Sequence, residues 1–308
     1  MKVHNQTVFS EFIILGFQDL QELHLLLFSG FLTIYLFTVL WNAFIITMAT
    51  LDQRLRTPMY FFLGNLSVLD ICYTTTTIPP MMSLLLTQRN SISYIGCLLQ
   101  LYFFFSFVGT ECLLLAVMAF DRYVAICKPL HYPLVIRRKF CLQLATLCWA
   151  SGFFNSAIHT CFAFRLPFCN DNRLDAFYCD IPPLLKLSCG DITLNQRLLL
   201  FIGLFIAWTP LFCILLSYAY IISTVLKIRS TEGRQKAFST CSSHLTVVLL
   251  YYGSCIFTYL RPISSQSSVN AKLIPLMYSI LTPLLNPVIY TLRNKDVKKA
   301  FQSAMGKI

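Results

Sequence analysis

Charged residues are scarce in this 308-residue chain, at 12% of the total, whereas a soluble globular domain averages about 25%. Acidic residues are the scarcest, since 13 Asp and Glu stand against 24 Lys and Arg. Hydrophobic residues make up 56% of the chain, and they come in blocks too long for a soluble core. The shortage of charge therefore argues against a soluble protein and favours one that lies in a membrane.

The motifs of membrane-embedded enzymes are also absent. The chain has no H-E-x-x-H run for a zinc protease, no G-x-S-x-G nucleophile elbow and no phosphate-cradling glycine loop. Asp70 and Glu111 lie outside the Tyr-Asp and Gly-x-Gly-Asp contexts of membrane aspartyl proteases. No C-x-x-C and no Cys/His cluster has zinc spacing. We therefore predict that the protein is not an enzyme and requires no cofactor.

Long apolar segments take the place of the missing charge. A helix needs about 20 mostly apolar residues to cross a bilayer. Seven segments meet this need, at about residues 24–50, 58–85, 94–127, 140–163, 195–227, 235–260 and 270–292. We predict an all-α membrane protein, a bundle of seven transmembrane helices over 24–292. Residues 1–23 form an N-terminal segment and residues 293–308 a C-terminal one.

The distribution of basic residues predicts the orientation. A net charge of +11 can indicate a nucleic-acid partner, but here most Lys and Arg fall in alternate loops, such as those near 128–139 and 227–236. The positive-inside rule makes that side cytoplasmic. We therefore expect the N-terminus outside, the C-terminus inside, a lipid bilayer as partner and no nucleic acid.

Residues on the predicted outer side carry two further signals. Asn5-Gln6-Thr7 is an N-glycosylation sequon. Four of the 13 cysteines also lie on this side, where an oxidising compartment favours disulfides. Four cysteines allow three pairings, and their spacing does not choose between them. They are Cys97, Cys169, Cys179 and Cys189.

Ionisable and amide side chains within the apolar segments are candidate functional groups. Asp70 and Glu111 lie midway along the second and third segments, where a carboxyl group must face the bundle interior and find partners. Asn42 and Asn286 are further polar groups at similar depth. The set suits a sodium ion. It equally suits a protonated, hydrogen-bonded pair that only holds helices together.

Two motifs lie near the predicted inner face. Asp121-Arg122-Tyr123 ends the third segment, and an acid beside an arginine there is either a switch or a snorkelling pair. The seventh segment contains Pro283 and Pro287. Prolines inside a helix remove backbone donors and bend it, which suits a moving helix but also a passive kink.

Five stretches carry motifs in a fixed order along the chain. They are Leu55–Asp70 (LRTPMYFFLGNLSVLD), Met118–Tyr132 (MAFDRYVAICKPLHY), Ser217-Tyr218, Lys236–Leu245 (KAFSTCSSHL) and Pro283–Asn294 (PLLNPVIYTLRN). Together they resemble the odorant (olfactory) receptor family of rhodopsin-like, class A, G-protein-coupled receptors. The resemblance spans nearly the whole chain, and three of the motifs are specific to the odorant branch.

The resemblance implies a role for each matching position. It implies a multi-pass receptor of the plasma membrane that couples to a stimulatory, olfactory-type heterotrimeric G protein and raises cyclic AMP. It pairs Cys97 with Cys179 and Cys169 with Cys189, and makes Asp70 and Glu111 the acidic pair of a core sodium site. The implied switch and G-protein residues are Asp121, Arg122, Tyr123, Tyr218, His244, Asn286, Pro287 and Tyr290.

The ligand site is predicted from helical spacing. Small-molecule sites are concave, mostly apolar and often lie between bundled helices, and residues three or four apart share one helix face. Such a face favours a small volatile ligand, mostly apolar, although each residue alone also suits ordinary interhelical packing. The set is Phe104, Phe105, Val108, Gly109, Cys112, Leu199, Ile202, Ile206, Tyr252, Cys255, Ile256, Tyr259 and Ser279.

Related receptor types are less consistent with these residues. An amine receptor needs Asp where Phe104 stands, and Lys272 is too close to the outer mouth for a retinal Schiff base. A peptide or lipid ligand remains an alternative, although the apolar residues disfavour a peptide. A transporter or channel with a coincidental polar core is the alternative from another class, but neither an inverted repeat nor a filter-like loop is visible.

Overall fold

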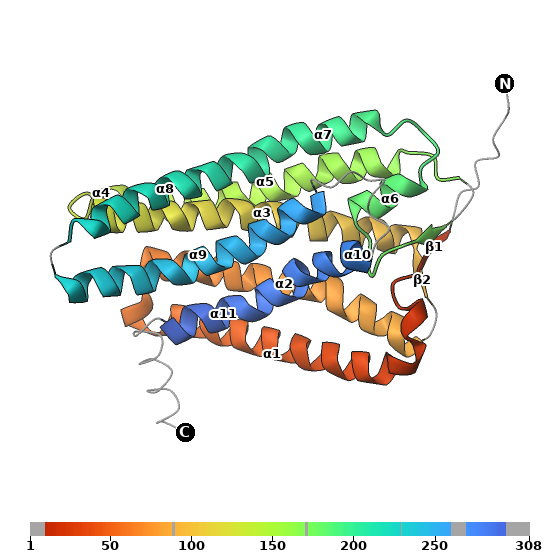
Figure 1. The fold of residues 1–308 in the computed structure, drawn as a ribbon, viewed down its shortest axis with the longest axis horizontal. Coiled ribbons are helices and arrows are strands. Elements are labelled where there is room, and N and C mark those ends of the chain that lie inside the picture. The colour runs from red at the N-terminus through yellow and green to blue at the C-terminus, as the bar shows by residue number, and fades with distance from the viewer. Residues whose placement is uncertain (1–9, 88–89, 170–171, 229, 260–268, 294–308) are drawn as a thin grey trace.

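The computed structural model describes residues 10–87, 90–169, 172–228, 230–259 and 269–293. Asn5, the predicted glycosylation site, lies outside them. The described chain forms an elongated bundle of long helices (Figure 1). Its main helices are α1 (His24–Leu51), α2 (Pro58–Thr87), α3 (Tyr94–Cys127), α5 (Arg138–Phe164), α7 (Thr193–Gly203), α8 (Thr209–Leu226), α9 (Thr231–Tyr259), α10 (Val269–Leu276) and α11 (Thr282–Arg293).

Five helical segments among the described residues are long and apolar enough to cross a membrane. They are His24–Leu51, Tyr94–Cys127, Thr193–Leu226, Cys241–Tyr259 and Leu273–Tyr290. The helices α2 and α5 are also long, but α2 contains four consecutive threonines at 74–77 and α5 opens on Arg138 and Lys139. The structure thus has helices in all seven predicted segments, and that all seven cross a membrane stays a prediction.

Two of the predicted helices are interrupted by π-helical turns. The segment η3 (Leu204–Trp208) separates α7 from α8, and η5 (Met277–Leu281) separates α10 from α11. A π turn inserts an extra residue, so side chains after it face a different direction. Pro283 lies in the first turn of α11, which follows η5 directly, so the backbone donor that it lacks is missing beside the π turn. Of the two expected kink prolines, only Pro287 lies in the interior of α11.

The helix α3 is the centre of the bundle. It packs most extensively against α5, then against α8 and α2. Gly152 of α5 makes the close approach to α3 possible, because a Cβ atom there would meet Thr110 Oγ1 and lie 2.6 Å from the carbonyl oxygen of Ser106. The long α3 therefore contacts most of the other helices and supplies side chains to each layer of the core.

A small sheet and the short helix α6 (Ile181–Leu187) cover one end of the bundle, which we call the sheet end (Figure 1). The strand β1 (Glu11–Ile14) lies between β2 (Ser91–Ser93), its antiparallel partner, and β3 (Arg173–Leu174), its parallel partner. Phe12, Ile14 and Phe17 are buried beneath the connecting chain. The short helix α4 (Tyr132–Val135) lies at the opposite end.

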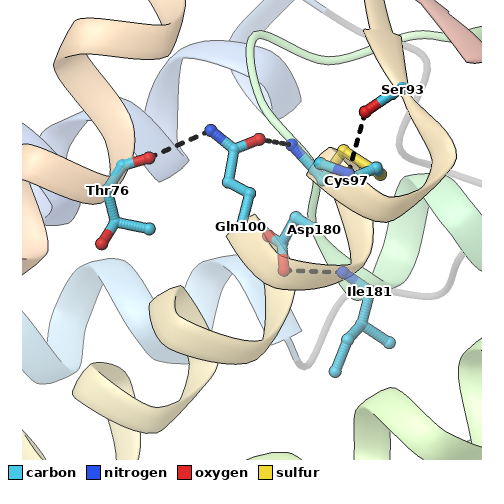
Figure 2. Close-up of a disulfide and its surroundings, with 8 residues drawn as sticks. Thr76, Ser93, Cys97, Gln100, Asp180 and Ile181 are labelled. Carbon is cyan, nitrogen blue, oxygen red and sulfur yellow. Dashed lines mark hydrogen bonds between the residues drawn. A yellow bond between two sulfur atoms is a disulfide. The ribbon is translucent and has the colours of Figure 1, made fainter.

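Two disulfides tie the chain between α5 and α7 at the sheet end. Cys97 of α3 is bonded to Cys179, and Cys169 is bonded to Cys189, the pairing that the resemblance implies. Gln100 reinforces the first bridge, since its side chain donates to the Thr76 carbonyl at 3.1 Å and accepts from the Cys179 N–H at 3.0 Å (Figure 2). Cys179, Asp180 and the following helix α6 (Ile181–Leu187) are thereby held against α3.

Candidate functional site

A cavity of about 250 Å³ lies between α3, α5, α9 and the α7–η3–α8 segment. This is below the range of about 300–1,000 Å³ for drug-sized ligands, so the cavity suits a small molecule. Among the described residues that line it there is no Lys, Arg, Asp or Glu. The lining comprises Phe105, Val108, Gly109, Cys112, Asn155, His159, Gln196, Leu199, Leu200, Gly203, Ile206, Ala207, Trp208, Leu211, Tyr252, Cys255, Ile256 and Tyr259.

Most of the residues selected by helical spacing line this cavity. They are Phe105, Val108, Gly109, Cys112, Leu199, Ile206, Tyr252, Cys255, Ile256 and Tyr259. Gly109 is located where the three walls meet. A Cβ atom there would lie 3.3 Å from both Asn155 Nδ2 and Ile206 Cγ2, and 3.4 Å from Gly152 Cα. A larger side chain at Gly109 would therefore fill part of the cavity.

Three predicted ligand residues do not line the cavity. Phe104 is fully buried in an aromatic cluster, with ring centroids 5.2 Å from Tyr73 and 4.8 Å from Tyr178. It occupies the α2-facing side of α3, because one residue turns a helix by about 100° away from Phe105. Ser279 is likewise buried, within η5. Both residues pack the bundle interior beside the cavity.

Ile202 is the third residue absent from the lining. Ile202 lies in the regular part of the helix, because α7 ends at Gly203 and the chain becomes π-helical only at Leu204. The residues of α7 and η3 that line the cavity are Gln196, Leu199, Leu200, Gly203, Ile206 and Ala207. This face of α7 is centred near Leu200 and Gly203, and Ile202 lies to one side of it because each residue turns a helix by about 100°.

The polar groups of α5 and α7 were missed by the spacing argument. Asn155 and His159 line the cavity from α5, and Gln196 lines it from α7. Asn155 and His159 are 5% exposed each and lie four residues apart, so they share one face. The sequence did offer a signal for these two residues, because an amide and an imidazole lie four residues apart within an apolar segment.

The α9 wall of the cavity holds hydroxyl groups that are already hydrogen-bonded. The Tyr252 hydroxyl donates to the Cys112 carbonyl at 3.1 Å, and the Tyr251 hydroxyl donates to the Val108 carbonyl at 2.6 Å. The Tyr259 hydroxyl lies 3.2 Å from an Asp180 carboxylate oxygen. These bonds connect α9 to α3 and to the disulfide-linked loop, so displacement of α9 must break or carry them.

Asp180 is a buried acid at the sheet end of the cavity wall. It caps α6, and its carboxylate accepts from the Ile181 N–H at 2.7 Å (Figure 2). It lies outside the predicted membrane segments and is 3% exposed. Burial raises the pKa of Asp180 from 3.8 to about 6, opposed by the bonds from Ile181 and Tyr259. The group is therefore charged at neutral pH and becomes protonated in mild acid.

The polar core predicted from the sequence is assembled in the structure. Asp70 accepts bonds from Asn286 Nδ2, 3.2 Å from each of its oxygens. Asn42 donates to the Pro283 carbonyl at 3.3 Å, which ties α1 to α11. Both carboxylate oxygens of Glu111, Asn42 Oδ1 and Asn286 Oδ1 are buried without a hydrogen-bond partner among the described residues. Such a set of unpartnered acceptors suits a proton or a cation.

At the end opposite the sheet, Asp121 and Arg122 do not bond to one another. Asp121 accepts from the Tyr132 hydroxyl at 2.8 Å. Arg122 Nη2 is buried and has no hydrogen-bond partner within the described ranges. Tyr123 packs instead against Tyr220, with ring centroids 5.8 Å apart. The arginine therefore retains an unused donor at this end of the bundle.

His244 links α9 to two other helices near Arg122. Its Nε2 lies 3.1 Å from the Leu115 carbonyl, and its Nδ1 lies 2.8 Å from the Tyr218 hydroxyl. A carbonyl only accepts, so Nε2 carries the proton, and a neutral imidazole then accepts the Tyr218 proton at Nδ1. The Tyr290 hydroxyl of α11 is buried without a partner among the described residues. Tyr218 and His244, two of the switch residues implied by the resemblance, are thus in direct contact.

Comparison with known proteins gives consistent matches along the chain. A family model described as "Olfactory receptor" matches residues 31–307. The chain is 49% identical over 304 residues to Olfactory receptor 2B6 of Mus musculus, covering 99% of this chain and 97% of that protein. It is 48% identical to human Olfactory receptor 2B2, covering 98% and 85%, and 47% identical to human Olfactory receptor 2G3, covering both chains completely.

Proposed function

The chain belongs to the olfactory receptor family of G-protein-coupled receptors, and from this premise we propose that it binds small volatile odorants in the cavity between α3, α5, α9 and α7–η3–α8. Family membership confirms that it is a multi-pass membrane receptor and not an enzyme. The observation that carries the proposal is the cavity itself. Its lining is apolar and aromatic, without a charged side chain among the described residues, which fits a neutral odorant.

We propose that the sheet end faces the outside of the cell and that the receptor acts at the plasma membrane. Both disulfides lie at this end, and disulfides persist in oxidising compartments. Arg137, Arg138 and Lys139 lie at the opposite end beside α4, where the positive-inside rule favours the cytoplasm. The proposed orientation puts the cavity nearer the outside and Arg122 nearer the cytoplasm.

Activation is proposed to work by a shift of population. The Tyr218–His244–Leu115 bonds hold α9 against α3 and α8, which favours a closed inner face. An odorant that binds the open form more tightly shifts the balance by its differential affinity. Opening exposes Arg122, whose free donor can then bond a G protein. We infer the stimulatory, olfactory-type heterotrimer, with a rise in cyclic AMP as the output.

A sodium ion is proposed as a structural component of the polar core. Asp70 and Glu111 supply carboxylates, and the unpartnered amide oxygens of Asn42 and Asn286 supply neutral ligands. Hard cations prefer such oxygen sets. An ion there would offset the cost of burying two acids and would hold α1, α2, α3 and α11 together.

Cyclic AMP accumulation in cells that display the chain tests the proposed function. We expect a dose-dependent rise with members of a chemically diverse odorant panel. Arg122→Ala, at matched surface expression, should abolish the rise because the arginine contacts the G protein. A response that persists in Arg122→Ala contradicts the proposed coupling. A response to no odorant, despite confirmed surface display, contradicts the proposed receptor function in that system.

A further inference from the structure

Three oxygen-bearing side chains form a continuous hydrogen-bonded chain at the sheet end of the cavity. The Tyr278 hydroxyl of η5 lies 3.1 Å from the Tyr259 hydroxyl of α9. The Tyr259 hydroxyl lies 3.2 and 3.5 Å from the two Asp180 carboxylate oxygens. Tyr259 lines the ligand cavity, whereas Asp180 lines a second cavity of about 210 Å³ on the other side. The Tyr259–Asp180 bond therefore joins a residue that lines one cavity to a residue that lines the other.

The direction of these bonds follows from the chemistry of the carboxylate. An ionised carboxylate accepts hydrogen bonds and donates none, so Tyr259 must give its single proton to Asp180. Tyr278 must then be the donor in its bond with Tyr259, because the Tyr259 hydroxyl has no second proton to give. The order is Tyr278 to Tyr259 to Asp180. The Tyr259 oxygen keeps one lone pair for a further partner, and it can serve that partner only as an acceptor.

The loop that carries Asp180 is fixed in place, so the direction is built into the fold. The neighbouring Cys179 is bonded to Cys97 and donates its N–H to Gln100. The Ile181 N–H holds one Asp180 oxygen at 2.7 Å (Figure 2). These three attachments leave the carboxylate little freedom to turn away from Tyr259. Asp180 therefore acts on the ligand cavity as a positioning residue, through Tyr259.

The second tyrosine of the α9 wall has the same polarity. The Tyr252 hydroxyl uses its proton on the Cys112 carbonyl at 3.1 Å, so its oxygen is also left as an acceptor. The facing α5 wall differs, since the Asn155 amide and the His159 imidazole can each donate. A ligand between the walls meets acceptors on the α9 side, and on the α5 side it meets groups that can both donate and accept. A hydroxyl group, which donates and accepts, satisfies both.

We propose that this cavity selects odorants with a hydroxyl group, alcohols and phenols, over ketones and ethers of the same carbon skeleton. The inference rests on the proposed function and specifies its ligand class. A ketone or ether oxygen can accept from α5 but gives no proton to the Tyr252 oxygen or to the remaining lone pair of the Tyr259 oxygen, so it makes one hydrogen bond fewer than an alcohol. An ammonium also donates, but no described residue that lines the cavity carries a countercharge, and burying an unpaired charge costs more than the bond returns.

The test compares matched ligands on wild-type receptor and on variants. A panel of medium-chain and monoterpenoid alcohols is used, each with its ketone and its methyl ether. Two measurements are made: the EC50 for cyclic AMP in cells, and the ligand-induced rise in Tm of the purified receptor. We expect each alcohol to be about tenfold more potent than its ketone, the effect of one hydrogen bond of about 1.4 kcal/mol. Ratios of potency cancel differences in surface expression.

The variants separate the inference from a general loss of folding. Tyr259→Phe keeps the ring that packs 5.8 Å from Phe105 and should lower the alcohol-to-ketone potency ratio severalfold, because only the Tyr252 oxygen then remains as an acceptor on the α9 wall. Asp180→Asn supplies both a donor and an acceptor to Tyr259, so the ratio should fall part of the way. Asp191→Asn is the matched control, because Asp191 is an exposed acid that bonds to Thr193 and not to Tyr259. Its ratio should equal that of the wild type.

Each outcome decides between the inference and the proposed function. Ketones or ethers as potent as their alcohols on the wild type overturn the inference, as does an unchanged ratio in Tyr259→Phe. A panel in which no alcohol raises the Tm also overturns it, whatever the cells report. Selective stabilisation by alcohols without cyclic AMP supports the inference and overturns the proposed signalling function instead.

Discussion

Asp180 connects the protonation state of the disulfide-linked loop to the cavity between α3, α5 and α9. Because the pKa of Asp180 is raised from 3.8 to about 6, the carboxylate becomes neutral as the pH falls through about 6. A protonated carboxyl can donate to Tyr259, which frees the tyrosine proton for the cavity. The groups that face Asp180 are Tyr259, Tyr278 and Tyr178, and Arg173, Asp175 and Lys186 line the adjoining cavity.

The expected result is that the preference for alcohols declines in acid. The ratio of ketone to alcohol EC50 should be smaller at about pH 5.5 than at about pH 7.4. Since the folded pKa is above the unfolded value, burial of the charged form is unfavourable, and the free energy of unfolding should rise as the pH falls from about 6 to about 4. Asp180→Asn should remove this contribution to both trends. An identical pH response in Asp180→Asn and wild type would show that another group titrates.

His244 is the residue whose loss should activate the receptor without ligand. His244→Phe removes the bonds to Tyr218 and to the Leu115 carbonyl, which together favour the closed inner face. A loss of about 1–2 kcal/mol changes a two-state ratio by a factor of roughly 5–30, so basal cyclic AMP should rise several-fold. Ser243→Ala is the control, because the buried Ser243 hydroxyl has no partner among the described residues. Basal activity equal in both variants would contradict the role given to His244.

At the scale of elements, the contact between α3 and α5 depends on one glycine. Gly152→Ala should force the helices apart, because the new methyl would meet Thr110 and the Ser106 carbonyl. Overpacking of this kind costs about 1–3 kcal/mol, which should lower the Tm of purified receptor and the amount at the cell surface. Gly64→Ala in α2 is the matched control, since nothing lies within 4 Å of its added methyl. Equal Tm values for the two variants would exclude a tight α3–α5 contact.

The sequence predicted the elements well where the chain is regular. The third predicted segment, 94–127, coincides with α3, and the first, 24–50, ends one residue before α1 does. Apolar runs and helical periodicity suffice for such helices. The π turns were beyond this reasoning, because hydrophobic patterns assume a constant period. Ile202 precedes the π turn and does not line the cavity because it lies beside the face of α7 that does, whereas Tyr252 and Tyr259 of α9 line the cavity.

The sheet end was also beyond the sequence argument. Residues 1–23 were expected only as a segment before the bundle, yet Phe12 and Ile14 are buried within a strand. The partners of β1 are residues 91–93 and 173–174, far along the chain. Short strands with distant partners leave little local signal of strand structure in the sequence. Phe104 shows the same limit in the core, because only packing against Tyr73 and Tyr178 reveals which way it faces.

At the scale of the whole molecule, the polar core should respond to sodium. A ligand that binds only the folded state raises stability with its concentration. We expect the Tm of purified receptor to be higher in sodium chloride than in choline chloride of equal ionic strength. Glu111→Gln should remove the difference, since it replaces one of the two carboxylates with a neutral amide. Equal Tm values for the wild type in both salts would rule out a sodium site and leave a protonated carboxyl pair.

The pairing of β1 with β3 also imposes an order in time on the synthesis of the receptor. The Asn172 side chain bonds to the Glu11 carbonyl across a separation of 161 residues, and the Ile13 N–H bonds to the Asn172 carbonyl at 2.8 Å. At about 5–20 residues per second, β1 waits roughly 8–30 s for β3 to be translated, although its other partner β2 is made earlier. During that interval Phe12 and Ile14 lack the burial that the finished receptor gives them. The start of the chain is thus made first, and its packing is completed late.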